Sequence, residues 1–117
     1  MLVAAGLVGA SGVALAAVAA HRIDSPALAT AAMMLMLHAT AGVALLAVSG
    51  RMSRSALWQK LAALMLGAVA LFSGDIALHT FTGARIFPMA APTGGSLLIA
   101  SWFCVALLAA LELRRLK

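Results

Sequence analysis

The sequence is poor in charged residues, and most of all in acidic ones. Only 9% of its 117 residues are charged and only three are Asp or Glu, whereas a soluble globular domain carries about 25% charged residues. The mean hydropathy is +1.13, and 65% of the residues are hydrophobic. This composition excludes a soluble globular domain and indicates a membrane protein.

Cysteine and the common catalytic motifs are also scarce. Cys104 is the single cysteine, which excludes an internal disulfide and a cysteine metal cluster, and we interpret it as a small core residue. The sequence contains no P-loop, dinucleotide-binding fingerprint or nucleophile elbow. We therefore expect neither an enzyme nor a protein with a bound metal or cofactor.

Four apolar runs are long enough to cross a bilayer, which takes about 20 helical residues. They predict an all-α, integral membrane four-helix bundle, a single transmembrane domain over residues 1–117, with spans at about 2–20, 27–49, 56–80 and 93–113. Ala17-Val18-Ala19 is typical of a signal-peptide cleavage site. No Lys or Arg precedes the first run, however, so we interpret it as a retained span.

The basic residues lie at the ends of the apolar runs. The isoelectric point is about 11.3 and the net charge is +5, but these bases are too few and too dispersed to indicate nucleic acid as a partner. With four spans, two of the eight basic residues, Arg22 and Arg85, lie on one side of the membrane. The other six lie on the side of the termini and the second loop: Arg51, Arg54, Lys60, Arg114, Arg115 and Lys117. Cytoplasmic loops carry the excess of Lys and Arg, so we predict that both termini are cytoplasmic.

Small residues recur in the runs at spacings that align them on one helix face. Such rows let helix backbones approach closely in lipid. We therefore predict helix contacts at six glycines: Gly6, Gly12, Gly67, Gly74, Gly94 and Gly95. For the last two we prefer packing to the alternative that their backbone N–H groups bind an anion at a helix start.

Ionisable residues gather at the predicted outer ends of the spans. Asp75 and His79 are four residues apart in the third run, so a helix places both on one face. The predicted topology puts His21, Asp24 and Arg85 on the same side of the membrane. Acids at membrane depth are costly and mark a functional site by default. These five residues form a candidate polar cluster.

This cluster has two interpretations. In the first, Asp75 accepts hydrogen bonds from Arg85 or from backbone donors and ties the outer loops to the helices. In the second, Asp75 and His79 bind a proton or a cation. His21, Asp75 and His79 are also metal-ligand types, but their spacing follows no metal motif. We prefer the structural interpretation.

His38 is the ionisable residue nearest the middle of a span, about 15 Å from either end at 1.5 Å per residue. A lone buried imidazole of this kind is typically a donor to a neighbouring helix. Three methionines precede it, at 33, 34 and 36, but without a Cys or a second nearby His they indicate gap-filling side chains rather than a copper site. His21 and His79 lie at a different predicted depth, which disfavours a bis-histidine haem with His38 and leaves His21 with His79 as the open pair.

Several of these residues also form a recognisable set. The set comprises His21, His38-Ala39, Phe72-Ser73-Gly74, Ala91-Pro92-Thr93-Gly94-Gly95 and Trp102. Together they resemble the YgdD-like family (domain of unknown function 423) of small bacterial membrane proteins, over nearly the whole chain. The resemblance implies a four-helix protein of the bacterial inner membrane and brings no assigned activity. Asp75 stands where the enterobacterial type has Ser, so a role for the carboxylate belongs to a subgroup.

The sequence favours a structural or accessory subunit, because small-residue rows are abundant and the chain is too short to enclose much of a pore. Its partners are then the lipid bilayer and either a larger membrane complex or further copies of the chain. The alternative is proton- or cation-linked binding or transport of a small ligand through the outer Asp and His residues. A membrane enzyme ranks last, since no nucleophile with a base is visible.

Overall fold

The computed structural model describes residues 1–115, which contain four helices and no strand. The helices are α1 (Leu2–His21), α2 (Pro26–Ser49), α3 (Ser55–Thr82) and α4 (Ala90–Arg115). All four are long and apolar enough to cross a membrane. The predicted all-α four-helix bundle of a membrane protein is confirmed, with helix ends at most three residues from the predicted ones. Lys117, one of the predicted cytoplasmic bases, lies outside the described residues.

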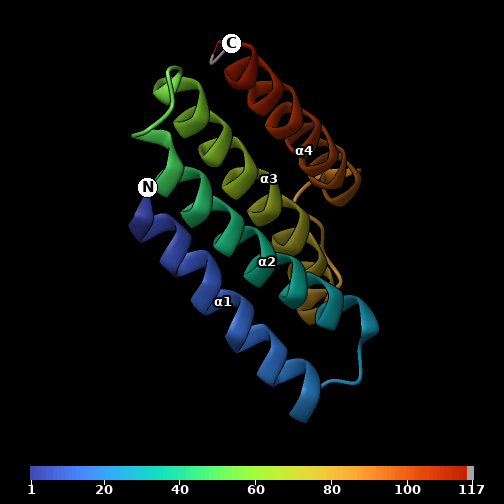
Figure 1. Cartoon of the computed structure of the whole chain (residues 1–117). Coiled ribbons are helices and arrows are strands. Elements are labelled where there is room, and N and C mark those ends of the chain that lie inside the picture. The colour runs from blue at the N-terminus through green and yellow to red at the C-terminus, as the bar shows by residue number, and fades with distance from the viewer. Residues whose placement is uncertain (116–117) are drawn as a thin grey trace.

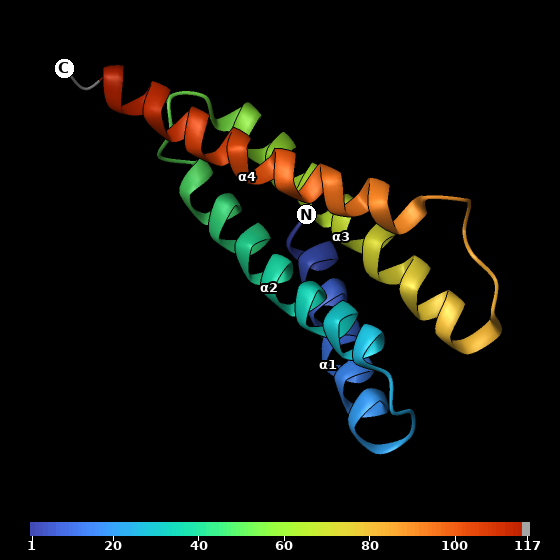
Figure 2. The same cartoon turned by 90° about the vertical axis from the view of Figure 1, so that its right-hand side faces the viewer.

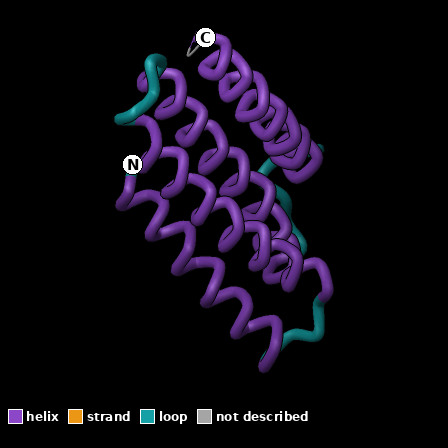
Figure 3. Tube along the Cα trace, viewed as in Figure 1, coloured by secondary structure: helices purple, strands orange, loops and turns teal. Residues whose placement is uncertain are grey.

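The helices stand in a row in chain order, alternate in direction (Figure 1) and are joined by short loops (Figure 3). α2 and α3 form the centre, with α1 packed along α2 and α4 packed along α3. In the described chain, no pair of Cα atoms within 8 Å joins α1 to α4. The molecule measures 53 × 26 × 19 Å. The bundle is therefore open, and α1 and α4 each leave one face uncovered.

The apolar core lies mainly between the two central helices and extends to α4. Within an apolar 18-residue stretch of each helix, 39% of the residues of α2 and 44% of those of α3 are buried. In α1 and in α4 only 11% are buried. Large hydrophobic side chains on the outer faces are exposed, which suits lipid because acyl chains are as apolar as leucine. The core comprises Leu35, Leu45, Trp58, Leu61, Ala62, Met65, Ala68, Val69 and Leu98.

Local signals explain where α2 begins and α3 ends. The Ser25 hydroxyl accepts a hydrogen bond from the N–H of Leu28, and Pro26 occupies the first turn of α2. α3 stops at Gly83, whose φ of 74° is the left-handed conformation that glycine adopts without strain. These ends follow the rules of helix capping rather than tertiary contacts.

α4 begins three residues before its predicted start. We expected Pro92 to keep the third loop non-helical, but Pro92 is the third residue of α4. A proline is tolerated there because the first four N–H groups of a helix have no acceptor within the helix. Met89, just before the helix, has a φ of 72°, which is strained for a residue with a Cβ.

The closest helix approaches occur at two of the predicted glycines. A Cβ on Gly12 of α1 would lie 2.7 Å from the Met36 side chain and 3.0 Å from the Ala32 carbonyl oxygen of α2. A Cβ on Gly94 of α4 would lie 2.6 Å from the backbone nitrogen of Phe72 in α3. Both glycines therefore permit backbone contact that a side chain would prevent.

The other four predicted glycines do not lie at such close helix approaches. Gly6 and Gly67 do not lie at helix contacts, in contrast to the prediction, because they are on exposed faces where a Cβ would meet no atom within 4 Å. Gly74 and Gly95 would make ordinary contacts of 3.8 Å and 3.5 Å. Gly42 of α2, which no sequence pattern indicated, faces a leucine of α3 at 3.0 Å. Spacing alone did not tell which face of each helix is covered.

Candidate functional site

Asp75 lies at the centre of the contacts between the outer part of α3 and the loop that leads to α4. It is fully buried, seven residues before the end of α3. Its Oδ2 accepts a hydrogen bond from Nη1 of Arg85 at 2.8 Å, and its Oδ1 accepts one from the N–H of Ile86 at 2.9 Å. The N–H of Ala91, in the first turn of α4, lies near this carboxylate, outside hydrogen-bonding geometry.

Two kinds of donor bond to Asp75: the charged guanidinium of Arg85 and the N–H of Ile86, both in the loop that leads to α4. The first turn of a helix has N–H groups without intrahelical acceptors and a partial positive charge, so it attracts a carboxylate. The Arg85 side chain remains 48% exposed while its guanidinium reaches the buried acid. An acid at membrane depth requires such pairing. The site therefore fixes the third loop and the start of α4 onto α3.

The structure does not bring the five residues of the candidate polar cluster together. Asp75 pairs with Arg85, whereas Nδ1 of His79 donates to the carbonyl oxygen of the residue that follows α3, at 3.1 Å. His21 and Asp24 are exposed, at the end of α1 and in the loop after it, and Figure 2 shows this loop far from the α3–α4 loop. Among the described residues, no group of three His, Cys, Asp or Glu side chains is placed to hold a metal.

His38 forms a second polar contact, between α2 and α4. It is 2% exposed, and Nδ1 bonds to the Met34 carbonyl oxygen at 2.8 Å while Nε1 of Trp102 bonds to Nε2 at 3.3 Å. A carbonyl only accepts and an indole N–H only donates, so these partners assign a neutral imidazole with its proton on Nδ1. We expected donation to a neighbouring helix; His38 instead donates within α2 and accepts from α4.

A third polar contact lies at the opposite end of the α3–α4 hairpin. Glu112 of α4 accepts hydrogen bonds from Oγ of Ser53 at 2.6 Å, from its N–H at 3.3 Å, and from the N–H of Arg54 at 3.1 Å. The indole N–H of the buried Trp58 lies near the same carboxylate, outside hydrogen-bonding geometry. Arg54 is the N-cap of α3 and has no side-chain cap bond of its own. Glu112 therefore caps α3 from α4.

Sequence reasoning missed Glu112, although one signal was present. An acid in the last turns of a helix faces the negative end of the helix dipole. That position is unfavourable unless the carboxylate has donors outside its own helix. Glu112, near the end of α4, has such donors in the second loop.

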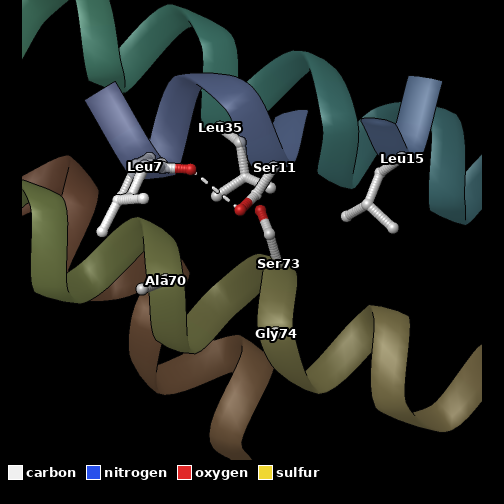
Figure 4. A pocket seen from close by; sticks show the side chains of 8 residues that line it. Leu7, Ser11, Leu15, Leu35, Ala70, Ser73 and Gly74 are labelled. Carbon is white, nitrogen blue, oxygen red and sulfur yellow. Dashed lines mark hydrogen bonds between the residues drawn. The ribbon is translucent and has the colours of Figure 1, made fainter. Parts of the chain in front are cut away.

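A cavity of about 260 Å³ lies between α1 and α3, with α2 behind it (Figure 4). Its two hydroxyl groups are already engaged, since Ser11 donates to the Leu7 carbonyl at 2.8 Å and Ser73 donates to the Ala31 carbonyl at 2.9 Å. The cavity therefore suits apolar groups and contains no residue of the candidate cluster. It is lined by Leu7, Val8, Ser11, Leu15, Leu35, Ala70, Ser73 and Gly74.

The comparison with known proteins places the chain in a family. No curated protein and no solved structure matches it. Residues 15–95, well over half of the chain, match the family DUF423, described as a protein of unknown function. This segment includes His38, Asp75 and Arg85, and it ends before Trp102 and Glu112. The resemblance to domain of unknown function 423 is thus confirmed, and the chain belongs to the DUF423 family of proteins of unknown function.

Proposed function

We propose that this multi-pass membrane protein is a structural or accessory subunit in the bacterial inner membrane. In this role it packs an uncovered helix face against the transmembrane helices of a larger complex. The observation that carries the proposal is the open row of helices, in which α1 is covered only on the side of α2 and α3. The proposal includes no enzymatic activity.

The uncovered face of α1 has the composition of a helix-packing surface. Gly6, Ala10 and Ala14 are exposed and form one row, while Ala5 and Gly12 are buried and form a second row on the side of α2. A Cβ on Gly6 would meet no atom within 4 Å. Rows of small residues bring helix backbones close together in lipid. The exposed row therefore suits a further helix in the same way that the buried row suits α2.

The polar contacts support a structural role over proton- or cation-linked transport. Asp75 accepts hydrogen bonds from a guanidinium and from a backbone N–H. Both ring nitrogens of His38 are bonded. A transport site needs groups that exchange a proton or cation with water, and these groups instead hold elements of the fold. The alternative would regain support if Asp75→Asn abolished a proton or cation flux into proteoliposomes.

The test compares two alanines of α1 that are both exposed. Ala10→Leu adds bulk in the small-residue row, and Ala4→Leu adds the same bulk on another side of the helix. Each protein is extracted in mild detergent, and copurifying membrane proteins are identified by native mass spectrometry. We expect the wild type and Ala4→Leu to retain a membrane protein partner that Ala10→Leu loses. Recovery of wild type with lipid or with copies of itself alone would contradict the proposal.

A further inference from the structure

A groove of about 300 Å³ lies between the first half of α3 and the second half of α4. Its walls consist of five leucines, among them Leu64 and Leu107, together with Cys104. Cys104 is exposed here, so its interpretation as a small core residue is wrong. Lys60 is the one charged residue in the lining. The groove is thus an apolar depression on the surface of two membrane helices, with an ammonium group beside it.

Lys60 is positioned to reach the membrane surface. It lies five residues after the start of α3, about 7.5 Å along the helix at 1.5 Å per residue, and it is exposed. A lysine at this depth lays its apolar stem along the helix and extends its ammonium group to the headgroup region. Within residues 1–115, no acidic side chain forms an ion pair with it.

The charge around this end of the bundle is positive. Arg51 and Arg54 lie at the adjacent second loop and Arg114 lies near the end of α4. Glu112, the acid at this end, is engaged by donors of the second loop. Its charge therefore does not offset the charge of Lys60 by direct pairing.

We propose that the groove binds an anionic phospholipid, with one acyl chain along the leucines and the phosphate at the Lys60 ammonium. Basic pockets between transmembrane helices on the cytoplasmic side are suited to anionic headgroups. A zwitterionic lipid offers the same acyl chain without the net charge. The inference does not depend on the proposed accessory function, because it concerns a different pair of helices.

The first experiment is a lipid titration followed by native mass spectrometry of the full chain. Phosphatidylglycerol is compared with phosphatidylcholine of identical acyl chains, using wild type, Lys60→Gln, and Arg22→Gln at the opposite end of the bundle as a charge-matched control. We expect wild type and Arg22→Gln to retain phosphatidylglycerol preferentially. Lys60→Gln should lower that retention about fivefold, the effect of one basic residue at an anionic surface. Equal losses in the two variants would show diffuse charge attraction and overturn the proposal.

The second experiment tests whether the acyl chain occupies the groove. Cys104 is the only thiol of the chain and lines the groove, so a bound chain should slow its alkylation by a membrane-permeable maleimide. We expect slower alkylation in phosphatidylglycerol than in phosphatidylcholine bilayers for wild type, and no difference for Lys60→Gln. Glycerol phosphate, a headgroup without chains, should give no protection. Equal rates in both lipids for wild type, or protection by glycerol phosphate, would overturn the proposal.

Discussion

Replacing Gly94 by alanine should force α4 away from α3. The added Cβ would lie 2.6 Å from the backbone nitrogen of Phe72, 2.8 Å from the carbonyl oxygen of Ala68 and 2.9 Å from the Phe72 Cα. All three atoms belong to the backbone of α3, so no side-chain rotation relieves the clash. Reaching an ordinary contact of 3.4 Å from 2.6 Å requires a shift of 0.8 Å. The helices must separate by about this distance at their crossing point.

Two effects set the magnitude. Extra volume in a well-packed contact costs about 1–3 kcal/mol. Alanine in place of glycine within a helix stabilises it by about 0.5–1 kcal/mol, because alanine loses less conformational entropy on folding. Because the neighbours of Gly94 are rigid backbone, the packing effect should dominate. We expect Gly94→Ala to lower the free energy of unfolding by about 1–2 kcal/mol.

Gly95→Ala is the matched control. A Cβ there would meet only the Phe72 ring, at 3.5 Å, which is an ordinary contact. Thermal unfolding of both variants in one detergent, followed by circular dichroism, should show Gly94→Ala below the wild type and Gly95→Ala equal to it or above it. Trp102 fluorescence should change only in Gly94→Ala, because moving α4 lengthens the 3.3 Å bond to His38. If the two variants unfold at the same temperature, the close approach at Gly94 does not limit helix packing.

Three further predictions concern the polar contacts and the strained loop. Asp75→Asn and Arg85→Gln should each lower the unfolding temperature, and the decrease in the double variant should be smaller than the sum of the two single decreases. Additive decreases would contradict the pairing. His38→Leu removes the acceptor of the Trp102 indole N–H, so the tryptophan emission spectrum should shift; an unchanged spectrum would contradict the bond. Met89→Gly should raise the free energy of unfolding by about 1 kcal/mol in a thermal melt, because the side chain is 66% exposed and φ is 72°; lower stability would mean that the side chain packs.

The four helices could be predicted from the sequence because the bilayer allows few alternatives. A spanning segment must satisfy its backbone hydrogen bonds internally, so about 20 apolar residues in a run specify a helix. The start of α4 was not predicted correctly, because a proline breaks a helix in its interior but not in its first turn, where Pro92 lies. The openness of the row also escaped it, because small residues occur on both the covered and the uncovered face of α1.

The candidate site was predictable only in part. Arg85 and backbone donors were among the expected partners of Asp75, and the structure provides both. The spacing of Asp75 and His79 gave their common helix face but not their partners, which depend on where the next helix begins. Trp102 bonds to a histidine 64 residues away and Glu112 to a backbone N–H 58 residues away. Contacts of this kind follow from the packing of α3 and α4, which no local pattern encodes.

Each helix of the hairpin supplies an acid to the segment that leads into the other helix. α3 supplies Asp75 to the N–H of Ile86 in the loop before α4, and α4 supplies Glu112 to the N-cap of α3. In an antiparallel pair, the N-terminus of each helix lies beside the later part of its partner, so an acid there reaches N–H groups that have no acceptor within their own helix. This explains how Glu112 is accommodated in the last turn of α4, where the dipole of its own helix disfavours an acid.

The same arrangement distinguishes the two halves of the molecule. Asp24, the third acid, is exposed in the loop between α1 and α2, and within residues 1–115 no side-chain hydrogen bond joins these two helices. α1 is held to α2 by close packing at Gly12, whereas α3 and α4 combine the contact at Gly94 with hydrogen-bonded carboxylates at both ends of the hairpin. The α3–α4 hairpin is therefore joined at both ends by carboxylates, whereas α1 meets α2 through close packing at Gly12.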